Sequence, residues 1–565
     1  MTTGIDPIRH VVAVVLENHS FDQMLGCLKA IYPDLEGVDP GNLRTNVDDK
    51  GKPFRQSPTT ERQMLLDPHH EVAHVATQLT NGNAGFVVDF SQSFPESDEQ
   101  SRQYIMGFYP LDFLPALHTL AREFTICDHW FSSLPGPTWP NRFFALSGTS
   151  LGRVSMPDDG THSADLAGYF QQDQDTLFDR LTEKGVDWKV YFHDIPQSWV
   201  MKHQRAPHNA ARYFYIREFF ADARGAERDF PQFCFIEPDF MGINENDDHP
   251  PHDVMKAEKL LADVYNALRE NAELWQSTLL VIFYDEHGGF YDHVVPPRAV
   301  PPDDCHDEYT FDRLGVRVPA LLVSPWVDKR VESSKFDHTS FLKYVTEKWS
   351  LTPLPSRRIA EATSIAVALT RTSARGDTVA RIRLTPDELK VPDLQTEELA
   401  AGMISAHHVA LRKLADFLPS ALWEDTKQET LEHLPQWYAA FARARVWAFN
   451  CLTWLTAHLA YALEAIKWGS DAVLAQLYQH GGMAASIAEP DKLVVKFRNE
   501  RNRVAEFLMH QKPRAVRGLA KRVKTPDTPI GERQHAVKTL ASITGRQFQL
   551  HGVEHARAWL SAQGQ

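Results

Sequence analysis

The chain has 565 residues, of which 43% are hydrophobic and 24% charged. This length and balance indicate a globular protein with two domains, or one large domain with an appendage, and exclude a chain that is disordered throughout. The net charge of −15 argues against a nucleic-acid binder, which would carry a basic surface. The five cysteines are scattered without CxxC spacing, which favours free thiols over a zinc ribbon or a disulfide scaffold.

The first apolar run covers residues 11–16 (VVAVVL), and its β-branched composition predicts a buried strand of a parallel sheet. The run is too short for a signal-peptide core and ends at Glu17, so we expect no classical signal peptide. The protein would then be cytoplasmic, would leave the cell by a leaderless route, or would have a leader outside these residues.

Three more apolar runs, at residues 230–236, 278–284 and 316–323, predict further strands, and residues 254–275 have apolar side chains at helical spacing. Strands that alternate with helices are typical of an α/β domain with a mainly parallel sheet between helices. Polar residues directly follow several of these runs. Because open α/β sheets bind their ligands at the carboxyl ends of the strands, we expect the functional site there.

The chain changes character after about residue 370. Residues 1–370 form the predicted α/β domain, residues 371–396 resemble a polar linker, and residues 397–565 show a helical pattern almost throughout. Residues 446–463 contain no Asp, Glu, Lys or Arg, which favours a buried helix, and residues 490–565 carry 15 Lys and Arg against 6 Asp and Glu, a net charge of +9. The alternative to a solvated basic surface is a peripheral membrane contact through this C-terminal region.

The segment after residue 284 carries the strongest chemical signal. Asp285 and Glu286 follow an apolar strand, two glycines allow a turn, and His293 lies eight residues after Asp285. Adjacent buried carboxylates repel each other unless a cation lies between them or one is protonated. A hard divalent cation resolves this conflict, with His293 available to bind the metal or a phosphate. The alternative is a polar surface turn.

Two other segments offer oxygen ligands. Glu17 and Asn18 also follow a strand directly, although ENHS could instead cap a helix. Thr138 lies in the proline-rich turn LPGPTWPNR, which precedes a helix-like run. A hydroxyl at that position is placed to attack phosphorus, while the helix N-terminus stabilises the phosphoryl oxygens. A simple N-cap role for Thr138 is the more common alternative.

Histidines beside turn residues provide groups that bind anions and transfer protons. Examples are His70 in DPHH, His193 in YFHD and His249 in DDHPPHD. Each of these alone is more often structural, but several in one domain favour a catalytic site.

Taken together, these motifs resemble the bacterial phosphoesterase family that includes phosphatidylcholine-type phospholipase C and the respiratory-burst-inhibiting acid phosphatases. The similar segments, between about residues 8 and 355, are ENHSFD, GPTWPNR, DEHGGFYDHVVPP, RVPALLVSPW and FDHTSFLKYV. The resemblance implies an alkaline phosphatase-like α/β fold, with a metal bound by Glu17, Asn18, Thr138, Asp285 and Glu286. It also implies that His70, His249 and, as a looser match, His193 surround the phosphoryl group; the catalytic assignment of His293 rests on its position alone.

The activity implied by the resemblance is phospholipase C-type hydrolysis of glycerophospholipids. A divalent metal ion, with zinc and calcium as candidates, would activate Thr138, and a phosphothreonine intermediate would form. One alternative is a soluble acid phosphatase that acts on phosphate monoesters. Another is a leaderless toxin or effector whose C-terminal helices bind a membrane or a partner, because the sequence lacks the leader and the small β-rich domains of secreted phospholipases in this family.

Overall fold

The computed structural model describes residues 6–64, 66–157, 168–193, 195–240, 245–305, 309–390, 405–411 and 413–414. The chain divides into two compact units, Met1–Glu424 and Asp425–Gln565, and every described residue belongs to the first. The predicted helical region 397–565, including residues 446–463 and the basic end, therefore lies almost entirely outside the described residues. The predicted boundary between residues 370 and 397 stays a prediction.

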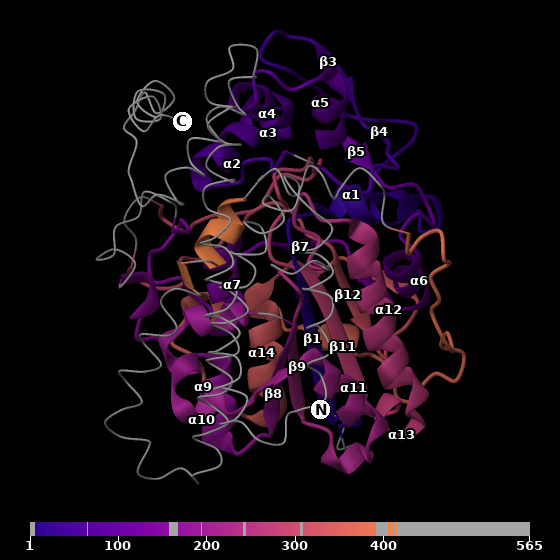
Figure 1. Cartoon of the computed structure of the whole chain (residues 1–565), viewed down its shortest axis with the longest axis vertical. Helices are drawn as coiled ribbons and strands as arrows, with labels where there is room; N and C mark the ends of the chain where they lie inside the picture. Colours follow the sequence, from indigo (N-terminus) through magenta and orange to yellow (C-terminus); the bar gives the residue numbers. More distant parts are fainter. Residues whose placement is uncertain are drawn as a thin grey trace, which may run out of the picture. The chain divides into compact units, whose positions relative to one another are not determined.

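An eight-stranded mixed sheet lies at the centre of the first unit, in the order β13-β6-β12-β11-β1-β10-β8-β9 (Figure 1). All neighbouring pairs run parallel except the two that β12 forms with β11 and β6. The predicted α/β fold with a mainly parallel sheet is confirmed. The strands are β1 (His10–Leu16), β6 (Thr125–Cys127), β8 (Trp188–Phe192), β9 (Tyr213–Tyr215), β10 (Phe233–Glu237), β11 (Thr278–Tyr284), β12 (Ala320–Val323) and β13 (Arg330–Glu332).

The central strands are apolar along their whole length because both faces of the sheet are covered. All seven residues of β1 and all seven of β11 are buried. β11 has the predicted bounds, whereas β10 and β12 begin later than predicted, at Phe233 and Ala320. Pro231 lies two residues before β10, and Pro319 directly precedes β12. Each strand begins after its proline because a proline has no backbone N–H to donate to a neighbouring strand.

Two groups of helices cover the sheet (Figure 1). Helices α7, α9 and α14 pack together on one side, and α6, α11, α12 and α13 on the other. No helix within the described ranges has the length and apolar character needed to span a bilayer. The helices of these groups are α6 (Pro115–Glu123), α7 (Thr138–Ser147), α9 (Leu177–Lys184), α11 (Ile216–Arg224), α12 (Val254–Glu270), α13 (Ala272–Trp275) and α14 (His338–Trp349).

The segment from residue 45 to residue 108 lies beyond the carboxyl ends of the central strands (Figure 1). It brings His70 next to Glu286, which follows β11. Its position makes it one wall of the site described below. Its elements are β2 (Thr45–Val47), β3 (Pro53–Arg55), β4 (Ser57–Pro58), α2 (Val72–Gln78), α3 (Thr80–Asn83), α4 (Phe86–Ser93), α5 (Glu99–Ile105) and β5 (Gly107–Phe108).

The other α-helices and strands of the described residues are α1 (Phe21–Leu25), β7 (Trp130–Phe131), α10 (Pro207–Ala210), β14 (Phe336–Asp337) and α15 (Arg357–Glu361), and short 3-10 helices cover Gly26–Ala30, Gln197–Val200, Lys202–Arg205, Glu227–Asp229 and Ile365–Ala368. The polar stretch after residue 370 packs along α12. Asn266 donates to the Ile382 carbonyl at 2.8 Å and accepts from the Ile382 amide at 2.9 Å, and Tyr265 donates to the Val379 carbonyl. These contacts attach residues 379–382 to the α/β domain.

Candidate active site

Glu17 and Asp285 leave the sheet side by side. The strands β1 and β11 are parallel neighbours with Leu16 opposite Tyr284, so the next residue of each strand lies at the same level. The Asp285 amide donates to the Leu16 carbonyl at 3.1 Å, and the Asn18 amide donates to Asp285 Oδ1 at 3.4 Å. The two acid-bearing segments, far apart in sequence, therefore meet at one point.

Both segments turn sharply at this point. Asn18 has a φ of +56°, a left-handed conformation that asparagine tolerates better than most residues, and Gly288 has a φ of +60°. The Gly288 amide donates to Glu286 Oε2 at 2.6 Å and so fixes the second carboxylate of the pair. The side chains of Glu17, Asn18, Asp285 and Glu286 are all buried.

Thr138 is the first residue of α7. The Asn141 side chain fixes the preceding turn, because its Oδ1 accepts from the Leu134 amide at 3.1 Å and its Nδ2 donates to the Gly136 carbonyl at 2.9 Å. Pro137, not Thr138, is the N-cap residue, and no side chain caps the helix. Thr138 Oγ1 is buried and forms no hydrogen bond with any described residue. A buried hydroxyl without a partner is costly, which indicates that it has a functional role.

Arg142 connects α7 to both acid-bearing strand ends. Its Nη2 lies 2.8 Å from Glu17 Oε1, and its Nε lies 2.9 Å from Asp285 Oδ2. Residues four apart on a helix share a face, so the Thr138 hydroxyl lies on the side of α7 that faces this pair. The threonine and the carboxylates thus converge on one region.

The acids of the site exceed their positive partners. Burial, followed by repulsion from Asp285, raises the pKa of Glu17 well above its usual value, and Arg142 only partly opposes this. Burial also raises the pKa of Asp285, and it raises that of Glu286 to about 8. The Arg142 guanidinium and the nearby His70 imidazole, 3.6 Å from Glu286, still leave one of three buried carboxylates without a cationic partner. The site therefore needs further positive charge.

The unpaired atoms of the site fit a divalent cation. Glu17 Oε2, Asn18 Oδ1, Thr138 Oγ1 and Glu286 Oε1 are buried and form no hydrogen bond within the described part of the chain. Surplus negative charge together with oxygen ligands matches the preference of a hard divalent ion. With Asp285 these four residues are the predicted metal ligands. They lie on three segments: the structure brings those of Glu17 and Asp285 into contact, and Arg142 ties both to α7, the helix that begins at Thr138.

Two of the predicted histidines lie beside the acids. His70 Nε2 is 3.6 Å from Glu286 Oε1, and the His70 ring lies edge-on to that of His249 with centroids 6.4 Å apart. Burial alone would lower the pKa of His70, but Glu286 and Asp67 outweigh it and raise the pKa to about 9. Burial lowers the pKa of His249 well below its usual value. At neutral pH His70 is therefore a cation and His249 a neutral imidazole.

His193 lies at the end of β8, on the margin of the site. Its Nδ1 donates to the Glu237 carbonyl at 3.2 Å, and its Nε2 lies 3.4 Å from the Asn246 side-chain nitrogen. The next residue, Asp247, accepts a hydrogen bond from the Glu17 amide at 2.8 Å through its carbonyl. One loop thus connects His193 to the first acid of the site.

The structure places His293 in a separate network. His293 Nδ1 lies 2.8 Å from Asp22 Oδ2, and its Nε2 lies 2.9 Å from Glu36 Oε1. Arg317, fully buried, contacts the same Asp22 at 3.0 Å. Both ring nitrogens are therefore engaged by carboxylates of this network, and within the described ranges we find no contact between His293 and Glu286.

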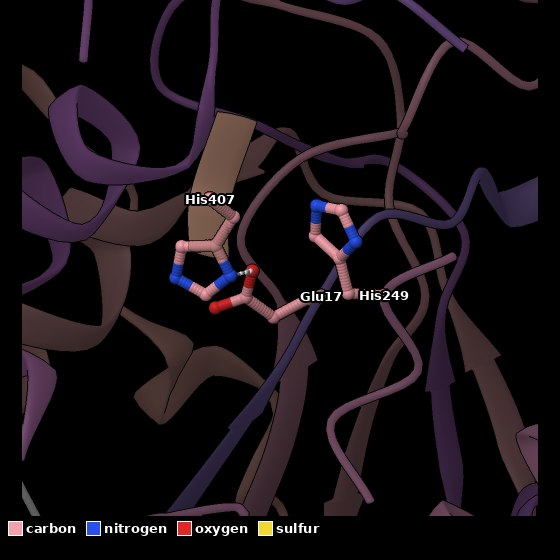
Figure 2. A group of neighbouring side chains, drawn as sticks. All are labelled: Glu17, His249 and His407. Carbon is pink, nitrogen blue, oxygen red and sulfur yellow. Dashed lines mark ion pairs between the residues drawn. The ribbon is translucent and has the colours of Figure 1, made fainter. Parts of the chain in front are cut away.

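The structure adds a residue that the sequence did not single out. His407 Nδ1 lies 3.2 Å from Glu17 Oε2, and Figure 2 marks this ion pair with a dashed line; the His407 ring stacks on that of His249 with centroids 5.3 Å apart. The sequence around His407 offers one hint of a functional role, the adjacent pair of histidines in ISAHHVAL, but this pair does not reveal which residues His407 contacts.

Comparisons with known proteins identify the family of this chain. The model of the Phosphoesterase family matches residues 8–352. Non-specific phospholipase C6 of Arabidopsis thaliana is 35% identical over 379 residues, which cover 61% of this chain and 68% of that protein. Phospholipase C A of Mycobacterium tuberculosis (strain ATCC 25618 / H37Rv) is 29% identical over 402 residues, which cover 62% and 74%.

Among solved structures, a protein in the alkaline phosphatase superfamily from Vibrio parahaemolyticus is 11% identical, with a TM-score of 0.28, and the likeness covers 69% of this chain and 93% of that one. The family match itself covers most of the chain and contains every segment that reaches the site except the one carrying His407. The chain therefore belongs to the Phosphoesterase family and is a phosphoric ester hydrolase.

Proposed function

We propose that this protein is a phospholipase C-type enzyme that hydrolyses glycerophospholipids, with Thr138 as the nucleophile. The observation that carries the proposal is the buried Thr138 hydroxyl, which lacks a hydrogen-bond partner among the described residues and lies one turn before Arg142. Arg142 contacts both Glu17 and Asp285. The names of the two relatives, a non-specific phospholipase C and a phospholipase C, support the substrate class.

Positive groups of the chain would hold the phosphoryl group. The first turn of α7 has no side-chain cap; Pro140 has no N–H and the Asn141 amide donates to the Pro137 carbonyl, so the Thr138 and Trp139 amides are the ones that would donate to phosphoryl oxygens. His70 adds a full positive charge, because the carboxylates around it raise its pKa to about 9. The predicted ligands Glu17, Asn18, Thr138, Asp285 and Glu286 would hold the cation. Bound there, a divalent cation supplies Lewis-acid chemistry, which lowers the pKa of a ligating hydroxyl and neutralises phosphate charge.

The reaction follows from the positions of two proton carriers. Thr138 Oγ1 attacks phosphorus and passes its proton to the ionised form of Glu286. The bond between phosphorus and the diacylglycerol oxygen breaks, and that oxygen takes a proton from His70 Nε2. The phosphorylated head group remains on Thr138. Water then attacks phosphorus, gives its proton to the neutral His70, and releases the head group while Thr138 regains its proton from Glu286.

The test uses the whole chain with vesicles of phosphatidylcholine and with a small chromogenic phosphate monoester. We expect diacylglycerol and phosphocholine from the vesicles, and a phosphothreonine whose phosphate still carries choline, which can be trapped by acid quench. Thr138→Ser serves as the control that keeps a hydroxyl. Hydrolysis of the monoester alone would favour the acid phosphatase alternative. Undiminished diacylglycerol release by Thr138→Ala would overturn the role of Thr138.

We also propose a peripheral membrane contact through the C-terminal region. Its support is the net charge of +9 over residues 490–565 in a chain of net charge −15. The full chain is expected to float with anionic vesicles at low salt and to lose this binding at high salt, since exposed charges are screened. Equal flotation with zwitterionic vesicles at both salt concentrations would contradict an electrostatic contact.

A further inference from the structure

We propose that His407 is a metal ligand, and that with Glu17 and His249 it forms a second cation position, suited to an ion of the zinc class. This position adjoins the all-oxygen position described above and shares Glu17 with it. The inference rests on the proposed function only in so far as both place a cation at Glu17. The family match does not imply this position, because His407 lies beyond the matched residues 8–352.

The geometry of the three side chains fits one small ion. One ligand atom from each of Glu17, His249 and His407 lies within 4.8 Å of the other two, and all three residues are buried (Figure 2). The separation between His407 Nδ1 and Glu17 Oε2 is 3.2 Å. Two ligands bound to one zinc ion at about 2.0–2.2 Å lie roughly 3.0–3.5 Å apart. The observed separation falls in this range.

Two of the converging atoms have no other partner. Glu17 Oε2 forms no hydrogen bond with a described residue, so its approach to His407 lacks hydrogen-bond geometry. His249 Nε2 is likewise buried and makes no hydrogen bond, and its separation from Asp67 Oδ2 is 3.9 Å. Buried polar atoms that remain unpaired are costly, and a cation between them would remove that cost.

In both histidines, the ring nitrogen that faces away from the proposed ion has a hydrogen-bond partner, as metal-binding histidines require. A ligating histidine usually donates its other N–H to a carbonyl or carboxylate, which fixes the ring and its tautomer. His249 Nδ1 donates to the Pro250 carbonyl at 2.5 Å. His407 Nε2 lies 2.6 Å from the Gln197 side-chain amide, whose own Oε1 is buried without a partner. A half-turn of this amide lets Oε1 accept from His407 Nε2–H, and Nδ1 then presents its lone pair to the ion.

The ligand set selects the ion. Imidazole nitrogens favour zinc and similar ions, whereas carboxylate, amide and hydroxyl oxygens favour calcium, magnesium or manganese. A histidine binds a metal through an unprotonated ring nitrogen, and each of these rings has one nitrogen toward the proposed ion and the other beside a hydrogen-bond partner. The two positions therefore differ in chemistry and can be occupied by different ions.

The experiment uses metal-free full-length protein that is dialysed against Zn²⁺ in the presence of excess Ca²⁺, followed by elemental analysis. His407→Phe keeps an aromatic ring against His249 and removes the ligand. His118→Phe is the matched control, because His118, on α6, is equally buried and its Nε2 contacts the Met24 carbonyl of α1, apart from the site. We expect the wild type and the control to retain one equivalent of Zn²⁺.

His407→Phe should bind that Zn²⁺ at least about 100-fold more weakly, since loss of even an outer-shell partner costs roughly 10–100-fold. Its Ca²⁺ content should not change. Equal Zn²⁺ affinity in the wild type and His407→Phe would overturn the proposal. If the variant does not fold, X-ray absorption of the wild type loaded with Zn²⁺ decides: two imidazole ligands support the site, and oxygen ligands alone refute it. Zinc bound through His407 in a protein that hydrolyses no phospholipid would overturn the proposed function and leave this site standing.

Discussion

Gly288 and Asn18 meet backbone against backbone: a Cβ atom on Gly288 would lie 2.2 Å from the Asn18 carbonyl oxygen. Both residues have positive φ values, +60° and +56°. The contact brings the turn that bears Asp285 and Glu286 against the turn that bears Glu17. A residue without a side chain is therefore needed at position 288 on two grounds, its conformation and its close approach.

Gly288→Ala should push these two turns apart. We expect the affinity for a divalent cation to fall by about 10–100-fold, as when other metal-supporting residues are lost, and phospholipid hydrolysis to fall with it. Gly185→Ala is the control, because Gly185 ends α9 with a φ of +74° but has open space around its Cβ position. That variant should lose only about 1–2 kcal/mol of stability from conformational strain. Calorimetric titration with Mn²⁺ compares the two, and equal affinities would show that the contact is not needed.

Thr138→Ala should lower kcat for phospholipid hydrolysis by at least about 10³-fold, because loss of a nucleophile removes the covalent route. Folding should be unaffected, since Thr138 Oγ1 forms no hydrogen bond within the described ranges. Thermal unfolding and steady-state kinetics measure the two effects. Thr138→Ser should keep substantial activity and a trappable phosphoenzyme. Equal activity losses in both variants would point to a packing role for the threonine methyl group instead.

Arg142→Met should destabilise the metal-free protein by about 3–5 kcal/mol, because removal of one partner leaves buried Glu17 and Asp285 without compensation. Saturating divalent cation should restore much of this loss, since the ion takes over the neutralising role. Urea unfolding in chelator and in metal gives both values. Arg212→Met, which breaks a partly exposed pair with Asp187, should cost at most about 1 kcal/mol in either condition. A loss that metal does not reverse would separate Arg142 from the cation site.

His293→Gln distinguishes a catalytic role from a structural one. Burial lowers the pKa of His293, but the Asp22 carboxylate outweighs burial and raises it to about 9. The folded protein therefore binds this proton more tightly than the unfolded chain. The resulting stability is fully present below the ordinary pKa of 6.5 and is lost as the pH rises through about 9.

The free energy of unfolding of the wild type should thus fall between pH 6.5 and 9, with a His293 contribution of at most about 3 kcal/mol. His293→Gln should be less stable at pH 6 and should lack this part of the decline. Its kcat should stay within a few-fold of the wild type at 25 °C if His293 acts only in the Asp22 network. A large fall in kcat with an unchanged stability profile would restore the catalytic assignment.

The strand ends of the site could be predicted because chemistry and periodicity coincide there. β1 and β11 are continuous apolar runs, and each is followed at once by acids, so their carboxyl ends mark the site. The antiparallel direction of β12 was not visible, since a short apolar run has the same composition in either direction. The metal ligands were predicted through short motifs that the family resemblance made specific.

Residues whose roles depend on distant contacts could not be assigned in this way. His293 lies close in sequence to Glu286, yet its ring contacts Asp22 and Glu36. His407 lies in a helical stretch far from every motif, and only the folded chain brings it to Glu17. Proximity along the chain is a poor guide where a turn reverses direction within a few residues.

The central position of β1 in the sheet has a consequence for folding during translation. β1 leaves the ribosome long before its neighbours in the sheet, β10 (Phe233–Glu237) and β11 (Thr278–Tyr284). Six adjacent apolar residues of β1, 11–16, therefore stay unpaired while most of the α/β domain is translated, and such unpaired edges attract other chains. We therefore expect chaperones that bind apolar segments to bind the nascent chain until β1 can pair with β10 and β11.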